Sequence, residues 1–260
     1  MSVPILTYHA VGDGPSPLWT SLPLFEAQIA AFAHSGWSTV PLAGLAARLE
    51  WGETLPERVL AITFDDGYES VHGLALSRLA DLGFTATVFL VTGHCGGLNR
   101  WPGQPPSVPE AALLSWPQIE RLAAAGWELG AHTLSHRPLP ALRPAEAEEE
   151  IAGSRHEIER RTGVTAATFA YPYGAVDTGT KAIVRRHFQS AVGTRLGLVE
   201  PASDRFELER VDAWYLPPRL VPVLDSSLYR SYLRLRQGGR AVRRRWRRDW
   251  VQPAAAGGLG

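Results

Sequence analysis

Four helix-like segments of this chain each end in a glycine that is followed at once by an apolar, strand-like run. Glycine accepts the left-handed backbone conformation that ends many helices, at no steric cost. Helices and strands are therefore expected to alternate, which predicts right-handed βαβ units and a parallel sheet. The four places are Ser35-Gly36-Trp37, Leu82-Gly83-Phe84, Ala125-Gly126-Trp127 and Thr162-Gly163-Val164.

Seven short apolar runs lack the alternation of half-exposed strands, which is typical of parallel strands buried on both faces. Seven such strands predict an α/β fold with one irregular barrel, and an open doubly wound sheet is the competing architecture. No Gly-x-Gly-x-x-Gly follows a strand, so a dinucleotide site has no support. The runs are residues 3–8, 59–64, 85–91, 128–131, 168–171, 190–193 and 210–214.

Helices are expected over residues 24–33, 70–82 and 144–162, and from Ser115 onwards, where serine is a good helix cap. The long segment 93–115 shows no clear element. Loops of this length in a compact domain are often functional.

Ionisable side chains stand where several predicted strands end. His9 ends the first run, Asp65 and Asp66 follow the second, and His132 and His136 follow the fourth. In a parallel barrel the carboxyl ends of all strands meet on one face, where active residues lie. These side chains are therefore expected to share one site.

Their chemistry fits a metal hydrolase. Adjacent aspartates point to opposite sides of an extended chain, and His132 and His136 could share one face of a helical turn. One carboxylate and two imidazoles form a common zinc set with an open position for water, and the second carboxylate can act as a base. Alone, Asp-Asp-Gly is typical of a turn and His-x-x-x-His of a solvated helix face. Their joint placement at strand ends favours the metal site.

Three motifs resemble those of one family. Thr-Phe-Asp-Asp-Gly, His-Thr-Leu-Ser-His and Phe-Ala-Tyr-Pro-Tyr-Gly, in this order, resemble the polysaccharide deacetylases (carbohydrate esterase family 4, the nodulation-protein-B homology domain). The likeness runs from Ile5 to Trp214, about four fifths of the chain. It implies a distorted (β/α)7 barrel and the removal of N- or O-acetyl groups from sugars.

The resemblance also implies residue roles. Asp65 matches the general base, and the backbone N–H of Tyr173 matches the group that helps to hold the oxyanion. The implied cofactor is a divalent metal, Zn²⁺ first, with Co²⁺, Ni²⁺ or Mn²⁺ as alternatives. The implied metal ligands are Asp66, His132 and His136.

Two departures from the family pattern bear on the mechanism. Ala170 stands where many members carry an arginine that braces the base, so Arg210 either takes over this role or lies at the surface. The C-terminal Leu-x-His that supplies the general acid is missing, and no histidine follows His187. The branch that resembles poly-N-acetylglucosamine deacetylases has an N-terminal Tyr-His instead. We therefore hypothesise that His9 is the general acid.

Three further side chains are candidates for substrate contact. Asn99 and Trp101 lie in the long loop, and Trp214 follows the last strand. Trp101 either stacks on a sugar or packs against the barrel rim. Trp214 either lines the pocket that would receive the acetyl group or belongs to the core.

These features predict a metal-dependent hydrolase that removes N-acetyl groups from an amino-sugar glycan or a lipid-linked saccharide. One alternative is hydrolysis of another amide or ester, such as an O-acetyl glycan or a ring amide. Another is a glycan-binding domain without turnover, against which the intact aspartates and histidines argue.

The C-terminal segment 226–260 reads as a basic tail after a barrel of residues 1–225. Of 26 basic and 26 acidic residues in the chain, nine arginines and one acid lie in residues 230–250, which leaves 17 basic and 25 acidic residues before them. Leu228, Tyr232 and Leu235 predict an amphipathic helix that ends before Gly238-Gly239. An anionic membrane surface and a disordered solvated tail are the alternatives, and no nucleic-acid partner is expected.

A cytoplasmic location, with attachment to the inner membrane face as its variant, is the expectation from two further observations. The first strand begins near residue 3 without a leader before it, and Cys95 is a lone cysteine.

Overall fold

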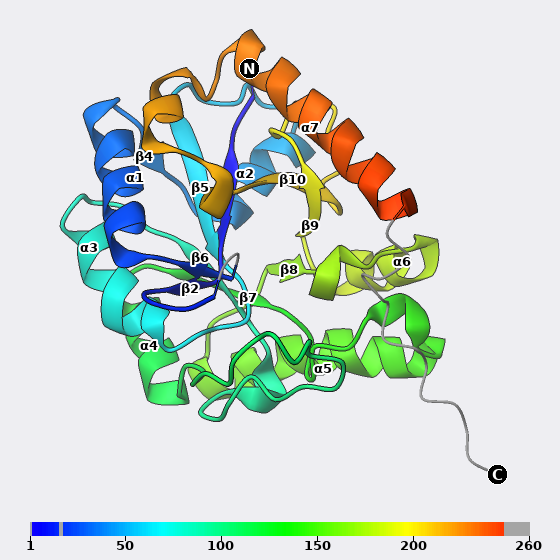
Figure 1. Cartoon of the computed structure of the whole chain (residues 1–260). Coiled ribbons are helices and arrows are strands. Elements are labelled where there is room, and N and C mark those ends of the chain that lie inside the picture. The colour runs from blue at the N-terminus through cyan, green and yellow to red at the C-terminus, as the bar shows by residue number, and fades with distance from the viewer. Residues whose placement is uncertain (1, 16–17, 247–260) are drawn as a thin grey trace.

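Seven parallel strands close into a barrel in the computed structural model, which describes residues 2–15 and 18–246. Figure 1 shows how these elements are arranged. The first strand pairs with both the second and the last, which closes the ring. The α/β barrel and all seven predicted strands are thereby confirmed. The strands are β1 (Ile5–Tyr8), β5 (Val59–Phe64), β6 (Thr87–Leu90), β7 (Glu128–Ala131), β8 (Thr168–Ala170), β9 (Ser190–Leu196) and β10 (Leu208–Asp212).

Three two-residue strands lie outside the ring and were not predicted, because two residues carry no pattern. They are β2 (Ala10–Val11), β3 (Trp19–Thr20) and β4 (Ser38–Thr39). β2 pairs with β3 directly after β1, and β4 extends the sheet beside β5.

Helices surround the barrel (Figure 1). The predicted segments 24–33 and 144–162 are helical, but the segment 70–82 divides into a π-helical turn, Val71–Ala75, and a short α-helix. A helix at 42–50 was not predicted. The α-helices are α1 (Leu22–His34), α2 (Leu42–Glu50), α3 (Leu76–Ala80), α4 (Trp116–Ala124), α5 (Pro144–Thr162), α6 (Thr178–His187) and α7 (Ser227–Trp246).

The barrel interior is closed at its amino end. Leu42 and Leu45 of α2 belong to the same buried cluster as Ile5, Phe89 and Val192 of the strands. Glu128, at the start of β7, accepts a hydrogen bond from the backbone N–H of Ala43 at 2.9 Å, as a carboxylate near a helix N-terminus should. The carboxyl end of the barrel is thus left for a site.

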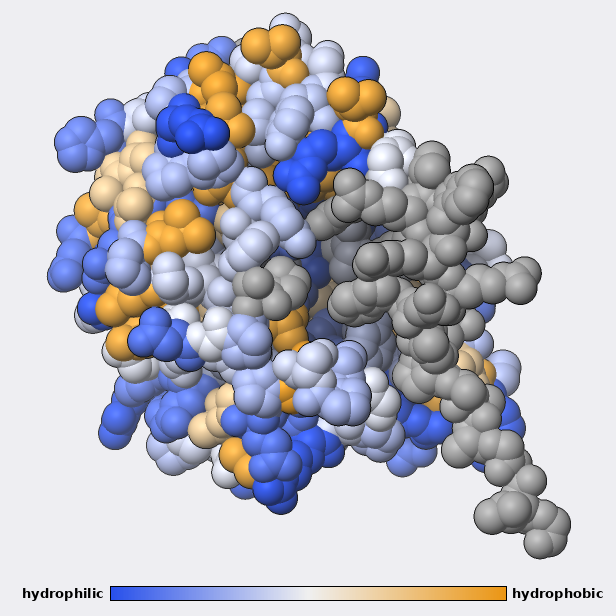
Figure 2. Space-filling model, viewed as in Figure 1, coloured by the Kyte–Doolittle hydropathy of each residue, from blue (hydrophilic) through white to orange (hydrophobic). Residues whose placement is uncertain are grey.

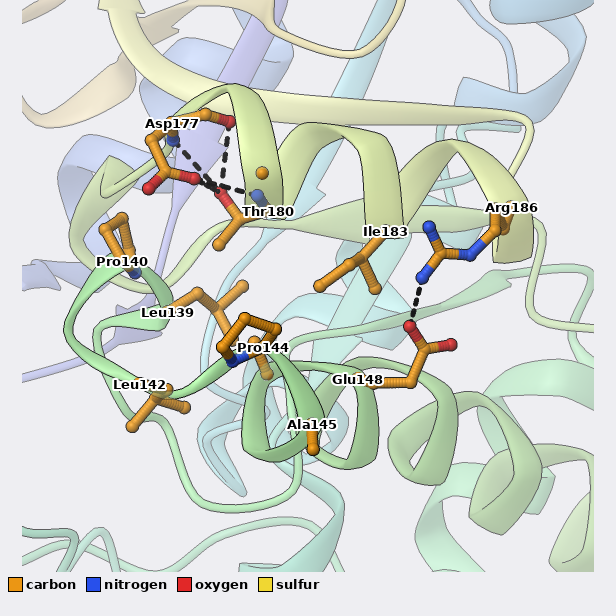
Figure 3. A pocket seen from close by; sticks show the side chains of 12 residues that line it. Leu139, Pro140, Leu142, Pro144, Ala145, Glu148, Asp177, Thr180, Ile183 and Arg186 are labelled. Carbon is orange, nitrogen blue, oxygen red and sulfur yellow. Dashed lines mark hydrogen bonds and ion pairs between the residues drawn. The ribbon is translucent and has the colours of Figure 1, made fainter.

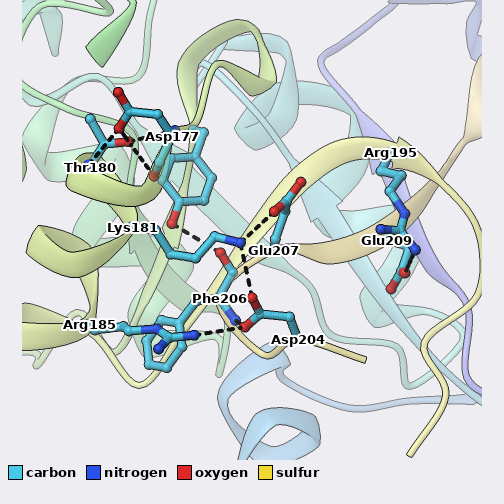
Figure 4. A network of polar contacts seen from close by, with 10 residues as sticks. Asp177, Thr180, Lys181, Arg185, Arg195, Asp204, Phe206, Glu207 and Glu209 are labelled. Atoms are coloured by element: carbon cyan, nitrogen blue, oxygen red, sulfur yellow. Dashed lines mark hydrogen bonds and ion pairs between the residues drawn. The ribbon is translucent and has the colours of Figure 1, made fainter. Parts of the chain in front are cut away.

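The β9–β10 connection is fastened to α6 by a charged network (Figure 4). The Lys181 ammonium pairs with Asp204 at 3.0 Å and with Glu207 at 2.5 Å. Tyr171, after β8, donates its hydroxyl to the Phe206 carbonyl at 3.0 Å. These contacts fix the neighbours of the last strand, which carries Arg210.

The tail prediction needs one correction. α7 continues through Gly238-Gly239 instead of ending before them. Among its residues up to 239, Tyr229 and Leu233 are buried on the barrel, and the predicted apolar face of Leu228, Tyr232 and Leu235 is exposed. The boundary at residue 225 stays a prediction, and residues 247–260 lie outside the described part.

No helix in the described part of the chain combines the length and the hydropathy that crossing a bilayer requires.

Candidate metal centre and active site

The register of the barrel brings the predicted site residues together at the carboxyl ends of the strands. Tyr8 pairs with Phe64, so the next residues, His9 and Asp65, leave the sheet side by side. The backbone N–H of Asp65 donates to the Tyr8 carbonyl at 2.9 Å. Pairing of β6 with β7 likewise delivers His132 to the same rim, where its N–H donates to the Leu90 carbonyl at 2.9 Å.

Asp66, His132 and His136 form a buried cluster whose ligand atoms all lie within 4.8 Å of one another. The Oδ1 atom of Asp66 is 3.3 Å from Nε2 of each imidazole. One carboxylate oxygen and two imidazole nitrogens converging in this way fit a catalytic zinc site, which keeps a position open. The donor set therefore fits a divalent metal.

Burial and the charges within the cluster shift the pKa values of its three members. Burial alone would raise the pKa of Asp66, but the two imidazoles outweigh it and hold that pKa well below its usual value. Burial lowers the pKa of His136, whereas contacts with Asp66 and Asp65 overcome burial and raise the pKa of His132. Metal binding thus competes with a proton at His132.

The orientation of each imidazole ring is set by neighbouring groups. Nδ1 of His132 lies 2.7 Å from the Ala170 carbonyl, which must accept its proton and so leaves Nε2 free for a metal. Nδ1 of His136 is buried without a hydrogen-bond partner in the described part of the chain. Its ring is held by packing against Trp101 and Tyr173, with ring centroids at 4.4 and 4.6 Å.

The two histidines meet through a loop, so the expectation that they share a helical turn is wrong. Thr133 and His136 have left-handed φ values of 69° and 57°. The Thr133 hydroxyl accepts from the His136 N–H at 2.9 Å. Nearby, Gly93 donates to the Leu134 carbonyl at 2.8 Å, and a Cβ at Gly93 would lie 2.5 Å from that oxygen.

Glu150 of α5 anchors this loop, a role that sequence reasoning missed because Glu150 stands among similar acids at the start of a helix. Its buried carboxylate accepts from the N–H groups of Leu134 at 3.0 Å and Ser135 at 2.9 Å. The Ser135 hydroxyl donates to its other oxygen. Glu150 therefore positions the segment that carries both histidines of the candidate metal site.

Replacing Glu150 with alanine should weaken metal binding by about 10- to 100-fold, because supports behind metal ligands have effects of that size. The substitution leaves two backbone N–H groups without their acceptor. Glu150→Gln keeps an acceptor and should retain most of the affinity, and Glu149→Gln, at an exposed neighbour, should have no effect. Zinc titration against a chromogenic chelator measures all three, and equal affinities would contradict the assignment.

Asp65, next to Asp66 in the chain, is held by Arg210. The guanidinium pairs with both carboxylate oxygens, Nη1 to Oδ1 and Nη2 to Oδ2, each at 2.7 Å. Arg210 is buried, so its predicted role beside Asp65 has the required geometry and its surface alternative is wrong. Its Nε donates to the Gly193 carbonyl at 2.8 Å, and Nη1 to the Thr63 hydroxyl at 3.2 Å.

This pairing keeps Asp65 ionised. Burial would raise the pKa of Asp65, but the charge and hydrogen bonds of Arg210, with contributions from His9 and His132, lower it below its ordinary value. Arg210 on β10 thus supplies from the last strand what Ala170 on β8 cannot supply.

His9 lies on the same side as Asp65. Its Nε2 is 4.0 Å from Oδ2 of Asp65, and its side chain is partly exposed. A group that donates a proton to a departing product must reach the open side of a site, and His9 does so. Its role as an acid stays a prediction.

Tyr173 follows β8 with a left-handed φ of 59°. Such a conformation is uncommon for a non-glycine residue and occurs often at functional sites. Burial, followed by the charge of the Asp66 carboxylate, raises the pKa of Tyr173 to about 12, so its hydroxyl is neutral. The ring of Tyr173 packs on His136, so its backbone lies at the rim beside the metal ligands.

The three predicted substrate contacts have different outcomes. Trp101 is buried against the rim and packs on His136, which favours the packing alternative. Trp214 is half-buried beyond the end of β10, where its ring meets Tyr215 edge-on at 4.7 Å. Whether Trp214 touches a sugar stays a prediction.

Asn99 needs a correction, since it is fully buried and its amide is occupied by protein groups. Its Nδ2 donates to the Pro109 carbonyl at 3.0 Å and to the Tyr68 hydroxyl at 3.2 Å, and its Oδ1 accepts from Ala111 N–H at 2.7 Å. The Tyr68 hydroxyl in turn is hydrogen-bonded to Asp66. Asn99 thus supports the candidate metal ligand Asp66 through Tyr68 instead of facing substrate.

A cavity of about 470 Å³ lies elsewhere, between α5, α6 and the turn Leu139–Ala141 (Figure 3). Its wall is largely apolar, with Leu139, Pro144 and Ile183 pointing into it, and the Glu148–Arg186 ion pair closes one end. None of the predicted site residues lines it.

Comparison with known protein families and sequences adds independent information. The family model described as "Polysaccharide deacetylase" matches residues 52–191. "Putative polysaccharide deacetylase YxkH" of Bacillus subtilis (strain 168) is 25% identical over 232 residues, covering 89% of this chain and 76% of that protein. The poly-beta-1,6-N-acetyl-D-glucosamine N-deacetylase of Staphylococcus epidermidis is 26% identical over 169 residues, covering 60% of this chain and 55% of that protein.

Solved structures share the fold. The Streptococcus pyogenes deacetylase PplD in complex with acetate superposes with a TM-score of 0.74 at 22% identity, covering 88% of this chain and 98% of that one. IcaB from Ammonifex degensii superposes with a TM-score of 0.71 at 24% identity, covering 85% and 94%.

Proposed function

The chain belongs to the polysaccharide deacetylase family, and we propose that it removes N-acetyl groups from an amino-sugar glycan or glycoconjugate and releases acetate. The observation that carries this is the pairing of two arrangements at the carboxyl ends of the strands. Asp66, His132 and His136 converge as ligands, while Asp65 beside them is kept ionised by Arg210. Such a pair of roles for neighbouring carboxylates suits the hydrolysis of an amide.

Asp66, His132 and His136 would hold a divalent cation, for which we propose Zn²⁺ because of the mixed carboxylate and imidazole set. When bound, such an ion supplies Lewis-acid chemistry: it polarises the acetyl carbonyl and makes a nearby water more acidic.

Asp65 is the proposed general base. Its carboxylate is ionised and oriented by Arg210, so it can accept a proton from the water that attacks the acetyl carbon. The backbone N–H of Tyr173 is the proposed donor to the carbonyl oxygen as negative charge develops there. Both groups are fixed before substrate arrives, since each is set by the barrel rim.

His9 is the proposed general acid. As the carbon–nitrogen bond breaks, the imidazole gives a proton to the leaving nitrogen, so that an amine and acetate result. Its position at the end of β1, next to Asp65 and open to solvent, supports this role.

His9→Ala should lower kcat by about 100-fold, the lower end of the range for a general acid, because the partly exposed site lets water donate in its place. Metal content should be unchanged, because the described ligand cluster does not include His9. His34→Ala, on the surface of α1, is the matched control. Turnover near that of the wild type with full metal loading would contradict the role.

The substrate class is tested by acetate release from a panel: an N-acetylated glucosamine oligomer, a lipid-linked N-acetyl sugar, an O-acetylated xylan and a ring amide. The N-acetyl-glucosamine polymer in the name of the Staphylococcus epidermidis relative supports the first two. Release from xylan or the ring amide alone would favour the alternative hydrolase, and release from none would favour a glycan-binding domain.

A further inference from the structure

We propose that α7 docks the enzyme on the surface of an anionic lipid bilayer, through an exposed apolar stripe flanked by arginines. The α7 stripe is defined here as Leu228, Tyr232 and Leu235. This role is separate from acetyl hydrolysis and does not require it.

The stripe is exposed although the helix is firmly packed. Leu228 and Leu235 are each 78% exposed and Tyr232 is 41% exposed, at the i, i+4, i+7 spacing of one helix face. Hydrophobic side chains reach the surface over the first half of α7 (Figure 2). The neighbouring face, with Tyr229 and Leu233, is buried on the barrel. The burial that holds the helix therefore does not account for the stripe.

The charge around the stripe is positive. Arg234 and Arg236 lie on the same helix, and the only acid that the described ion pairs give to Arg234 is Glu200, at 3.5 Å on the surface. The sequence from residue 240 to 248 adds six arginines. An apolar face with basic flanks is the pattern of helices that lie in the interface of a membrane, where each arginine near anionic headgroups contributes about 1 kcal/mol.

This pattern favours lipid over nucleic acid as the anionic partner. Exposed leucines gain nothing from a phosphate backbone, whereas the acyl boundary of a bilayer would bury them. The barrel before residue 230 carries 17 basic and 25 acidic residues, so the excess of basic charge is confined to the C-terminal segment that begins with this helix.

Side-chain contacts fasten the helix that carries the stripe to the barrel. Gln237 accepts from the Leu196 N–H at 3.1 Å, at the end of β9. The Arg236 guanidinium lies 5.0 Å from the ring of Tyr215 and 5.8 Å from that of Tyr232. Tyr215 in turn contacts Trp214 beyond β10. At the other end of the helix, Arg230 donates to the Ser2 hydroxyl at 3.2 Å, before β1, so contacts along α7 keep it on the barrel while the stripe stays exposed.

Co-sedimentation of the full chain with vesicles tests the proposal. Wild-type protein should bind vesicles of phosphatidylcholine with phosphatidylglycerol, bind phosphatidylcholine alone at least about tenfold more weakly, and lose binding as salt rises. Leu228→Ser with Leu235→Ser should reduce binding about tenfold or more. Trp51→Ser, which removes an equally exposed (76%) apolar side chain after α2, should not.

Several outcomes would overturn the proposal. Equal binding to both vesicle types would do so, as would unchanged vesicle binding by the double variant. So would a wild-type protein that binds RNA but no vesicles, if the double variant loses the RNA binding. A concentration-dependent dimer that the double variant abolishes would assign the stripe to a second copy. Acetate release from a soluble N-acetylated oligomer should be unchanged in the double variant, so failure of docking and failure of the proposed activity are measured separately.

Discussion

Replacing Asp65 with asparagine should lower kcat/KM on an N-acetylated amino sugar by about 1,000-fold or more, within the range for loss of a general base. An amide cannot take the proton of the attacking water. Its shape is close to that of the carboxylate, and the described ligand cluster does not include Asp65, so the metal should stay bound. Acetate release and metal content, measured on the same folded sample, give the result.

Asp81→Asn, on the surface after α3, is the control for the same chemical change. If Asp65→Asn kept its turnover, Asp65 would not be the base. If turnover and metal content fell together, Asp65 would instead be needed for metal binding.

Replacing Arg210 with methionine should reduce the free energy of unfolding by about 3–5 kcal/mol, because it leaves the buried Asp65 carboxylate without its cation. Urea unfolding measures the change. Arg195→Met on β9 is the matched control, since the Arg195–Glu209 pair at 2.8 Å is largely exposed on its arginine side and should contribute at most about 1 kcal/mol.

The double variant Asp65→Asn with Arg210→Met should recover part of the lost stability, because it removes the uncompensated charge. Losses that simply add would show that the pair is not coupled. If Arg210→Met and Arg195→Met had the same free energy of unfolding, burial of the Arg210–Asp65 pair would not increase its contribution to stability.

The strand ends could be predicted because local chemistry sets them. Glycine at Gly36, Gly83, Gly126 and Gly163 adopts positive φ, as the helix-ending pattern requires. When buried strands follow each of these helix ends, few topologies are available for the seven strands. Ionisable residues at their carboxyl ends were then placed on one face by the topology alone.

The faces of the peripheral helices could not be predicted in the same way. Residues 228–235 contain two apolar stripes, and packing on the barrel selects Tyr229 and Leu233 over the other. Helix α2 has only nine residues with Gly44 inside, a weak helical signal, and its stability comes from closing the barrel.

Supporting contacts around the site also escape sequence reasoning. Glu150 is 14 residues from His136 along the chain, and only the path of α5 brings its carboxylate to the loop. Asn99 and Trp101 are residue types that can bind sugars, but both side chains are buried in the folded loop.

The closure of the ring by β1 and β10 has a consequence for how the protein is made. Asp65, on the second strand, needs an arginine from the last strand and lies beside a histidine from the first. During synthesis some 145 further residues must therefore be added after Asp65, the proposed base, before its arginine partner is part of the chain. Enzymatic competence arises as one late event, and its appearance on the growing chain would report the moment at which the barrel closes.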